Sequence, residues 1–218
     1  MLVLCLLEYL KLNSRRERGE SHFFKIINKY GVLFFRIIKK KVRKYKYEKN
    51  KKEVRKYKMI TFKGTPVTLE DKYINVGDSA PDFHLTNKEL KEITLKDTSG
   101  KRIFVIVPSV DTPVCDREVR RFNEEAAKLN NVSIYVVSMD LPFAQSRWCG
   151  SAGIDKVTIL SDYKNRDFGK NYGVYIKELG LLTRAIIIVD ENNKVSYVEY
   201  CNEVSSEPDY EAALNAVK

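Results

Sequence analysis

The stretch Ile103-Phe104-Val105-Ile106-Val107-Pro108-Ser109-Val110-Asp111-Thr112-Pro113-Val114-Cys115 decides the fold of this chain. Its first five residues form a short, largely β-branched apolar run, which predicts a buried strand. The periodicity then becomes helical, because residues of one inward face recur at three- and four-residue spacing: Cys115, Val119, Phe122, Ala126 and Leu129. Thr112 suits a helix N-cap and Pro113 the first helical position. The pattern therefore predicts a strand over 103–107 and a helix over 113–129.

Cys115 is expected in the first turn of that helix, directly after a buried strand. Free backbone N–H groups and the helix dipole stabilise a negative charge at this end, which favours the thiolate form of a cysteine. The thiolate is the nucleophilic form, so Cys115 is a candidate nucleophile. Position alone is equally consistent with a small core residue at the start of a helix.

Two motifs carry a resemblance to a known family. The spacing of Pro108, Thr112 and Cys115 resembles the active-site motif of peroxiredoxins. The longer PSVDTPVC, together with LPFAQSRWCG at 141–150, is similar to the thiol peroxidase branch of that family. The resemblance covers residues 59–218. It implies an α/β, thioredoxin-like fold, with an N-terminal β-hairpin extension and a central mixed sheet flanked by helices.

The rest of this region has the pattern of such a layered fold, with strands alternating with helices. Ile60 to Leu69 predict a hairpin around a turn at 63–66, and residues 76–83 predict a loop. Further strands are expected at 132–137, 157–160, 184–189 and 194–200, the last two joined by a turn at 190–193. Helices are expected at 142–148, at 167–172 and after Pro208, where the inner face would comprise Tyr210, Ala213, Leu214 and Val217.

The resemblance assigns catalytic roles to five residues. Cys115 would be the peroxidatic nucleophile, and Pro108 would shield its thiolate from water. The hydroxyl of Thr112 would lie near the sulfur and the substrate oxygen; helix capping is its ordinary role, and both roles could hold together. Arg184 matches the family's active-site arginine, which holds the thiolate and polarises the peroxide. Without the resemblance, an arginine at the start of a strand is more often a solvated charge.

The fifth residue, Cys149, matches the family's resolving cysteine. Attack on a peroxide leaves a sulfenic acid, which a second thiol can capture as a disulfide. Because a disulfide needs Cα atoms within about 7 Å, two cysteines in separate helices are expected to require a local rearrangement. Trp148 is expected to pack beside Cys149.

The resemblance therefore implies a thioredoxin-dependent, homodimeric thiol peroxidase that reduces hydrogen peroxide and alkyl hydroperoxides. The four cysteines are few for a secreted disulfide scaffold, which favours a reducing cytoplasm. A redox-sensing or binding module that signals through Cys115 is the alternative, and the absence of Cys-x-x-Cys disfavours a general disulfide oxidoreductase. Cys201 is expected to be structural. Neither a metal nor an organic cofactor is expected, since His22 and His84 are too few and too far apart.

Residues 1–58 differ sharply in composition from the rest. They carry 19 Lys/Arg and 5 Asp/Glu, which leaves 20 and 24 of the chain's 39 and 29 for residues 59–218. The net charge of +10 therefore belongs to the N-terminal segment, and nucleic-acid binding by the domain is not expected. We expect this segment to be disordered or to reflect a misassigned start codon upstream of Met59. If it is translated, a basic membrane-surface anchor is the alternative.

Overall fold

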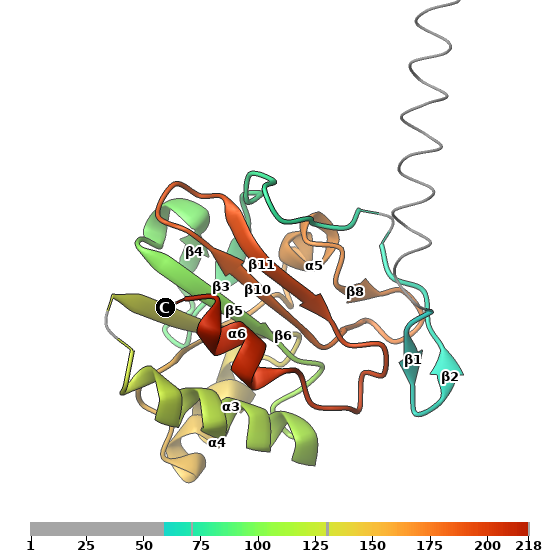
Figure 1. Cartoon of the computed structure of the whole chain (residues 1–218). Helices are drawn as coiled ribbons and strands as arrows, with labels where there is room; N and C mark the ends of the chain where they lie inside the picture. Colours follow the sequence, from blue (N-terminus) through green and yellow to red (C-terminus); the bar gives the residue numbers. More distant parts are fainter. Residues whose placement is uncertain (1–58, 71, 130, 218) are drawn as a thin grey trace, which may run out of the picture. The chain divides into compact units, whose positions relative to one another are not determined.

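The computed structural model describes residues 59–70, 72–129 and 131–217 (Figure 1). The expectations for residues 1–58 lie outside this part of the chain. A sheet of seven strands organises the described region, and its centre is parallel: β5 pairs with β6 and β6 with β7. Antiparallel strands complete both edges, so the sheet is mixed, as expected. In spatial order the strands are β11 (Val195–Tyr200), β10 (Ala185–Val189), β5 (Lys101–Ile106), β6 (Val132–Ser138), β7 (Thr158–Ser161), β3 (His84–Thr86) and β4 (Glu92–Thr94).

Helices cover both faces of this sheet. Successive residues of a strand point to opposite faces, so Ile103 and Val105 of β5 enter one core cluster and Phe104 and Ile106 the other. The first cluster is covered by α3 (Pro113–Ala126), α4 (Pro142–Ala152) and α6 (Tyr210–Asn215). The second is covered by α5 (Asp167–Asn171), which adds Phe168. The thioredoxin-like layered class expected from the sequence is confirmed (Figure 1).

The ends of three helices differ from the predictions. α3 ends at Ala126 rather than at residue 129, and the chain continues as turns. α4 runs on to Ala152, where Gly153 adopts a left-handed conformation that ends the helix. α6 begins at Tyr210 rather than at Pro208, because the side chain of Asp209 caps it by accepting from the Ala212 N–H at 3.0 Å.

The N-terminal hairpin is confirmed with a tighter turn than predicted. β1 (Thr61–Phe62) pairs with β2 (Thr65–Pro66), so the turn is Lys63-Gly64 rather than residues 63–66. Both turn residues have positive φ, which matches the twist that two-residue hairpins require. The hairpin of β3 and β4, the 3₁₀ turn at Leu95–Asp97, and the short pair β8 (Tyr175–Ile176) and β9 (Leu181–Leu182) had no counterpart in the predictions.

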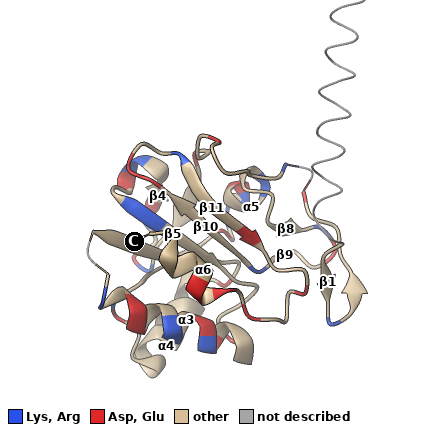
Figure 2. Cartoon of the chain, in the orientation of Figure 1, with Lys and Arg blue, Asp and Glu red and all other residues tan. Residues whose placement is uncertain are grey.

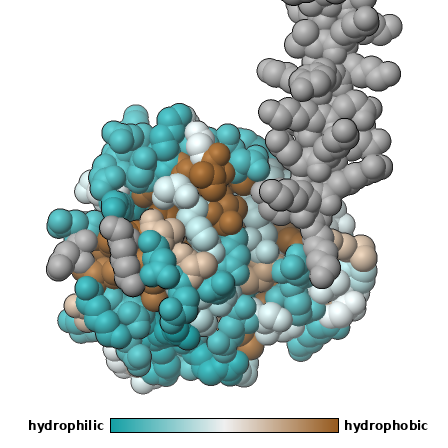
Figure 3. Space-filling model, in the orientation of Figure 1, coloured by the Kyte–Doolittle hydropathy of each residue, from teal (hydrophilic) through white to brown (hydrophobic). Residues whose placement is uncertain are grey.

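The surface of the described region is mixed in charge. Acidic and basic residues both occur along α3 (Figure 2). The face in Figure 3 is largely hydrophilic, with separate apolar areas. Among the described residues, no helix combines the length and the apolar character that crossing a membrane would require.

Candidate active site

Cys115 lies at the meeting point of β5 and α3. The strand delivers the chain to Pro108, which is buried, and a short loop leads to Thr112 at the start of α3. Cys115 follows in the first helical turn with a fully buried side chain. Thr112 has the backbone position of an N-cap, but its hydroxyl makes no capping hydrogen bond and instead donates to the Cys115 sulfur at 2.7 Å. The local fold therefore directs a hydroxyl at the thiol.

Arg184 contributes a second donor to the same sulfur. It directly precedes β10, which lies beside β5 in the sheet. Its Nη2 donates to the Cys115 sulfur at 3.2 Å, and its Nε donates to the Val204 carbonyl at 2.8 Å. The side chain is 1% exposed, so the solvated charge that position alone suggested is excluded. A positive charge beside the sulfur stabilises the thiolate and any anion that develops as a peroxide bond breaks.

Glu118 holds the remaining nitrogen of this guanidinium. Its Oε2 pairs with Arg184 Nη1, and its side chain is fully buried. A buried ion pair of this kind keeps both partners in one geometry, because separating them would leave an uncompensated charge. Sequence reasoning missed Glu118. The signal was its place three residues after Cys115 and four before Phe122, on the inward face of the helix.

Asp140 supports the loop between β5 and α3 and was also missed. Its Oδ2 accepts from the Val110 N–H at 2.8 Å and from the Ser138 hydroxyl at 2.7 Å. It lies just past the end of β6, which is parallel to β5, so both strands end at the same edge of the sheet. A polar residue directly after a buried parallel strand was the available signal.

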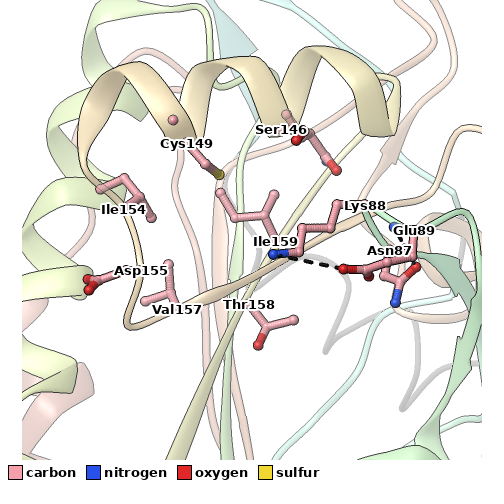
Figure 4. Close-up of a pocket in the computed structure, with 12 residues that line it drawn as sticks. Asn87, Lys88, Glu89, Ser146, Cys149, Ile154, Asp155, Val157, Thr158 and Ile159 are labelled. Atoms are coloured by element: carbon pink, nitrogen blue, oxygen red, sulfur yellow. Dashed lines mark hydrogen bonds and ion pairs between the residues drawn. The ribbon is translucent and has the colours of Figure 1, made fainter.

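Cys149 lies on α4 and packs against the core cluster that contains Cys115, but it makes no hydrogen bond to Thr112, Cys115 or Arg184. Both Cys115 and Cys149 are free thiols, and Cys149 is half-buried. Burial raises the pKa of the Cys149 thiol, which favours its protonated form. Figure 4 shows Cys149 projecting from α4 toward Ile159 at the side of a cavity of about 520 Å³. The cavity is lined by Asn87, Lys88, Glu89, Gln145, Ser146, Cys149, Gly150, Ile154, Asp155, Val157, Thr158 and Ile159, so Cys115 is not one of its walls.

Cys201, His84 and Trp148, the other candidates among the described residues, lie in environments that suit structural roles. Cys201 is 7% exposed, and burial raises its thiol pKa to about 12, so it stays protonated at neutral pH. His84 Nδ1 lies 2.6 Å from Asp167 Oδ2, which raises the histidine pKa chiefly through this hydrogen bond. The backbone N–H of Cys201 donates to the Arg184 carbonyl at 3.0 Å, but no hydrogen bond joins either the Cys201 thiol or the His84 ring to the Cys115 sulfur. Trp148 packs as expected but also donates from Nε1 to Asp116 Oδ1 at 3.1 Å.

Comparison with known proteins connects this geometry to a family. The sequence model of the Redoxin family matches residues 75–214. A thiol peroxidase of Clostridium acetobutylicum is 57% identical over 159 residues, which are 73% of this chain and 97% of that protein. A thiol peroxidase of Bacillus subtilis is 54% identical over 160 residues, with 73% and 96% covered.

Solved structures agree on the fold. A peroxiredoxin-like protein of Aquifex aeolicus superposes with a TM-score of 0.69 at 42% identity, covering 72% of this chain and 94% of that one. A thiol peroxidase of Chromobacterium violaceum superposes with a TM-score of 0.67 at 23% identity, covering 72% and 93%, which supports the fold alone. The chain therefore belongs to the Redoxin family and, within it, to the thiol peroxidases.

Proposed function

We propose that this thiol peroxidase reduces hydrogen peroxide and alkyl hydroperoxides with Cys115 as its nucleophile. The single observation that carries the proposal is the pair of donors at the buried Cys115 sulfur, Thr112 Oγ1 at 2.7 Å and Arg184 Nη2 at 3.2 Å. A thiolate held by a cation, with a hydroxyl alongside, suits attack on a polarised O–O bond. Pro108, buried at the end of β5, would limit the access of water to the sulfur.

The first step would convert one peroxide into an alcohol or water. The Cys115 thiolate attacks one peroxide oxygen, an S–O bond forms, and the O–O bond breaks with its electron pair on the leaving oxygen. That oxygen takes a proton and leaves, and Cys115 becomes a sulfenic acid. The guanidinium of Arg184 would stabilise the negative charge on the leaving oxygen, and the Thr112 hydroxyl would help to align the peroxide.

The second step would use Cys149 as the resolving thiol. Its sulfur attacks the sulfenic sulfur of Cys115, a disulfide forms, and water leaves. A dithiol reductant then reduces the disulfide by thiol–disulfide exchange, and we propose thioredoxin as that reductant. This cycle requires a compartment that keeps the reductant reduced, so we place the enzyme in the bacterial cytoplasm.

We also propose that the enzyme forms a homodimer. Leu141 and Phe143 flank the start of α4 and are 51% and 64% exposed, so two large apolar side chains face solvent close to Cys149. An exposed apolar pair suits an interface. Sedimentation of the wild type and of Phe143→Glu tests this: a dimer that becomes a monomer supports it, and a monomeric wild type contradicts it.

Peroxide-dependent NADPH oxidation, coupled through thioredoxin reductase and thioredoxin, tests the catalytic proposal. Cys115→Ser should abolish turnover. Cys149→Ser should consume one equivalent of peroxide and then stop, whereas the matched control Cys201→Ser should retain turnover. Full turnover by Cys149→Ser would remove that residue from the resolving role, and turnover by Cys115→Ser would overturn the proposal.

A further inference from the structure

Asp116 connects the helix of one cysteine to the helix of the other. Its Oδ1 accepts the hydrogen bond from Trp148 Nε1 at 3.1 Å, and its Oδ2 accepts from Arg120 Nε at 2.9 Å. Arg120 Nη1 in turn donates to the carbonyl of Ala152, the last residue of α4, at 2.8 Å. The guanidinium carbon of Arg120 also lies 6.0 Å from the centroid of the Trp148 ring system. We call these contacts the Asp116–Trp148–Arg120 bridge.

Two residues of the bridge are direct sequence neighbours of the two reacting cysteines. Asp116 directly follows Cys115, and Trp148 directly precedes Cys149. Neighbouring residues on an α-helix point about 100° apart. While Trp148 is held against α3 by Asp116, Cys149 is therefore directed elsewhere, and it projects toward Ile159 and the cavity described above (Figure 4). Bringing the Cys149 sulfur to Cys115 requires α4 to turn or unwind, and either movement displaces Trp148.

We propose that Asp116 is a positioning residue, which holds α4 through Trp148 and thereby limits the rate at which Cys149 resolves the oxidised Cys115. The proposal rests on the two-cysteine cycle proposed above. It concerns the step in which the Cys149 sulfur bonds to the sulfenic sulfur of Cys115 and water leaves. Releasing α4 would break the bridge first. It would also expose the Cys149 thiol to water, and so remove the burial that favours its protonated form.

The bridge has a consequence for inactivation by excess peroxide. A sulfenic acid that waits for Cys149 can react with a second peroxide, which adds one oxygen to give a sulfinic acid and releases water or alcohol. Resolution and this second oxidation compete for the same species. A bridge that slows resolution therefore makes the enzyme more sensitive to high peroxide, and weakening the bridge should make it more resistant.

Rapid-quench alkylation with intact-mass detection separates the two steps on the full chain. Asp116→Ala and Trp148→Phe each remove the hydrogen bond between Trp148 Nε1 and Asp116 Oδ1. We expect Cys115 to be oxidised to its sulfenic acid at the wild-type rate. The rates are compared at equal thiolate fraction of Cys115, which the pH dependence of its alkylation gives for each protein. Disulfide should form about fivefold faster, which corresponds to about 1 kcal/mol for one hydrogen bond. The peroxide concentration that converts half of Cys115 to sulfinic acid should rise by about the same factor.

A double variant and a matched control make the test specific. If both substitutions remove the same contact, Asp116→Ala/Trp148→Phe should resolve no faster than either single variant. Arg117→Ala is the control, because Arg117 also lies in the first turns of α3 but pairs with Glu207 at 3.0 Å instead of with α4. It should resolve at the wild-type rate.

The outcomes distinguish this proposal from the one on which it rests. A wild-type protein that never forms a Cys115–Cys149 disulfide contradicts the two-cysteine cycle itself. A wild type that forms the disulfide, with unchanged or slower resolution in both Asp116→Ala and Trp148→Phe, overturns the bridge proposal alone. Equal acceleration in Arg117→Ala would also overturn it, since the effect would then arise from any change in charge on α3.

Discussion

The hydroxyl of Thr112 lies 2.7 Å from the sulfur of Cys115, and Thr112 makes no side-chain cap at the start of α3. Of the two roles considered for the Thr112 side chain, helix capping and contact with the Cys115 sulfur, the structure shows the second. Backbone conformation and the following proline begin the helix, while the side chain is directed at the sulfur. A substitution that removes only the hydroxyl should therefore affect chemistry more than stability.

Thr112→Val should slow the peroxide reaction about tenfold, because the side chain keeps its shape but no longer donates toward the sulfur or the substrate. Thr112→Ser keeps the hydroxyl and should stay within about threefold of the wild type. Stopped-flow measurement of the second-order rate constant for the reaction with peroxide tests both expectations. The free energy of unfolding should change by less than the ~1 kcal/mol typical of a lost N-cap. Equal rates in all three proteins would leave Thr112 with only a structural role.

The sequence predicted much of this site because its residues lie close together along the chain. The strand, the turn and the first helical turn that hold Thr112 and Cys115 are all local, so periodicity and capping preferences locate them. The environment of Arg184 depends instead on β10 lying beside β5, a contact between distant segments that no local pattern specifies. Position alone therefore favoured a solvated charge, and the family motif indicated the buried site.

The helix and hairpin ends were predicted less well for a related reason. α4 ends at Ala152, four residues beyond the predicted end at Trp148, and its last turn packs against the core through Ala152. The short strands β3, β4, β8 and β9 have two or three residues each, too few for a period-2 pattern. They are fixed by pairing with other strands rather than by their own sequence.

Arg184→Lys tests whether three separate donors are needed. Arg184 uses Nε for Val204, Nη1 for Glu118 and Nη2 for Cys115. A lysine keeps the charge but has a single nitrogen, so it cannot reproduce this fork. We expect a loss of about 100-fold in the rate constant with peroxide, comparable to the loss of one donor from a preorganised anion site. A lysine variant with wild-type kinetics would show that charge alone suffices.

Arg184→Ala should in addition destabilise the fold. It leaves the Glu118 carboxylate, fully buried, without its ion-pair partner. Breaking a buried pair in this way costs about 3–5 kcal/mol. Urea denaturation of Arg184→Ala and of Arg184→Ala/Glu118→Met measures the effect, and the double variant should recover part of the loss. If the single variant is as stable as the wild type, the pair does not hold the site together.

A chain that begins at Met59 should fold and retain full peroxidase activity. The core clusters of the described residues are built from positions 60–217, and the proposed catalytic residues lie between Pro108 and Arg184. Removing residues 1–58 also removes their net charge of +14, the difference between 19 Lys/Arg and 5 Asp/Glu. Turnover numbers and denaturation midpoints of the two chains provide the comparison. A truncated chain that is unfolded or inactive would show that the extension is part of the working domain.

Asp162 should contribute less to the stability of the domain as the pH rises toward neutrality. Its side chain is 1% exposed and accepts from the backbone N–H of Gly169 at 2.8 Å. Burial raises the pKa of this carboxyl from 3.8 to about 7, against the effect of its hydrogen bonds. Below pH 4 the group is protonated in both the folded and the unfolded state. Between pH 4 and 7 the unfolded chain releases the proton and the folded one keeps it, so the free energy of unfolding decreases.

Asp162→Asn removes this titration and isolates its contribution. The wild-type free energy of unfolding, minus that of Asp162→Asn, should decline as the pH rises from 4 to 7. At its steepest the slope should be about 1.4 kcal/mol per pH unit, and the difference should level off above pH 7. Urea denaturation in reducing buffer at several pH values measures the difference. If the free energy of unfolding depends on pH in the same way for the two proteins, Asp162 is already ionised in the folded state at low pH. The hydrogen bonds from α5 would then outweigh the effect of burial on its pKa.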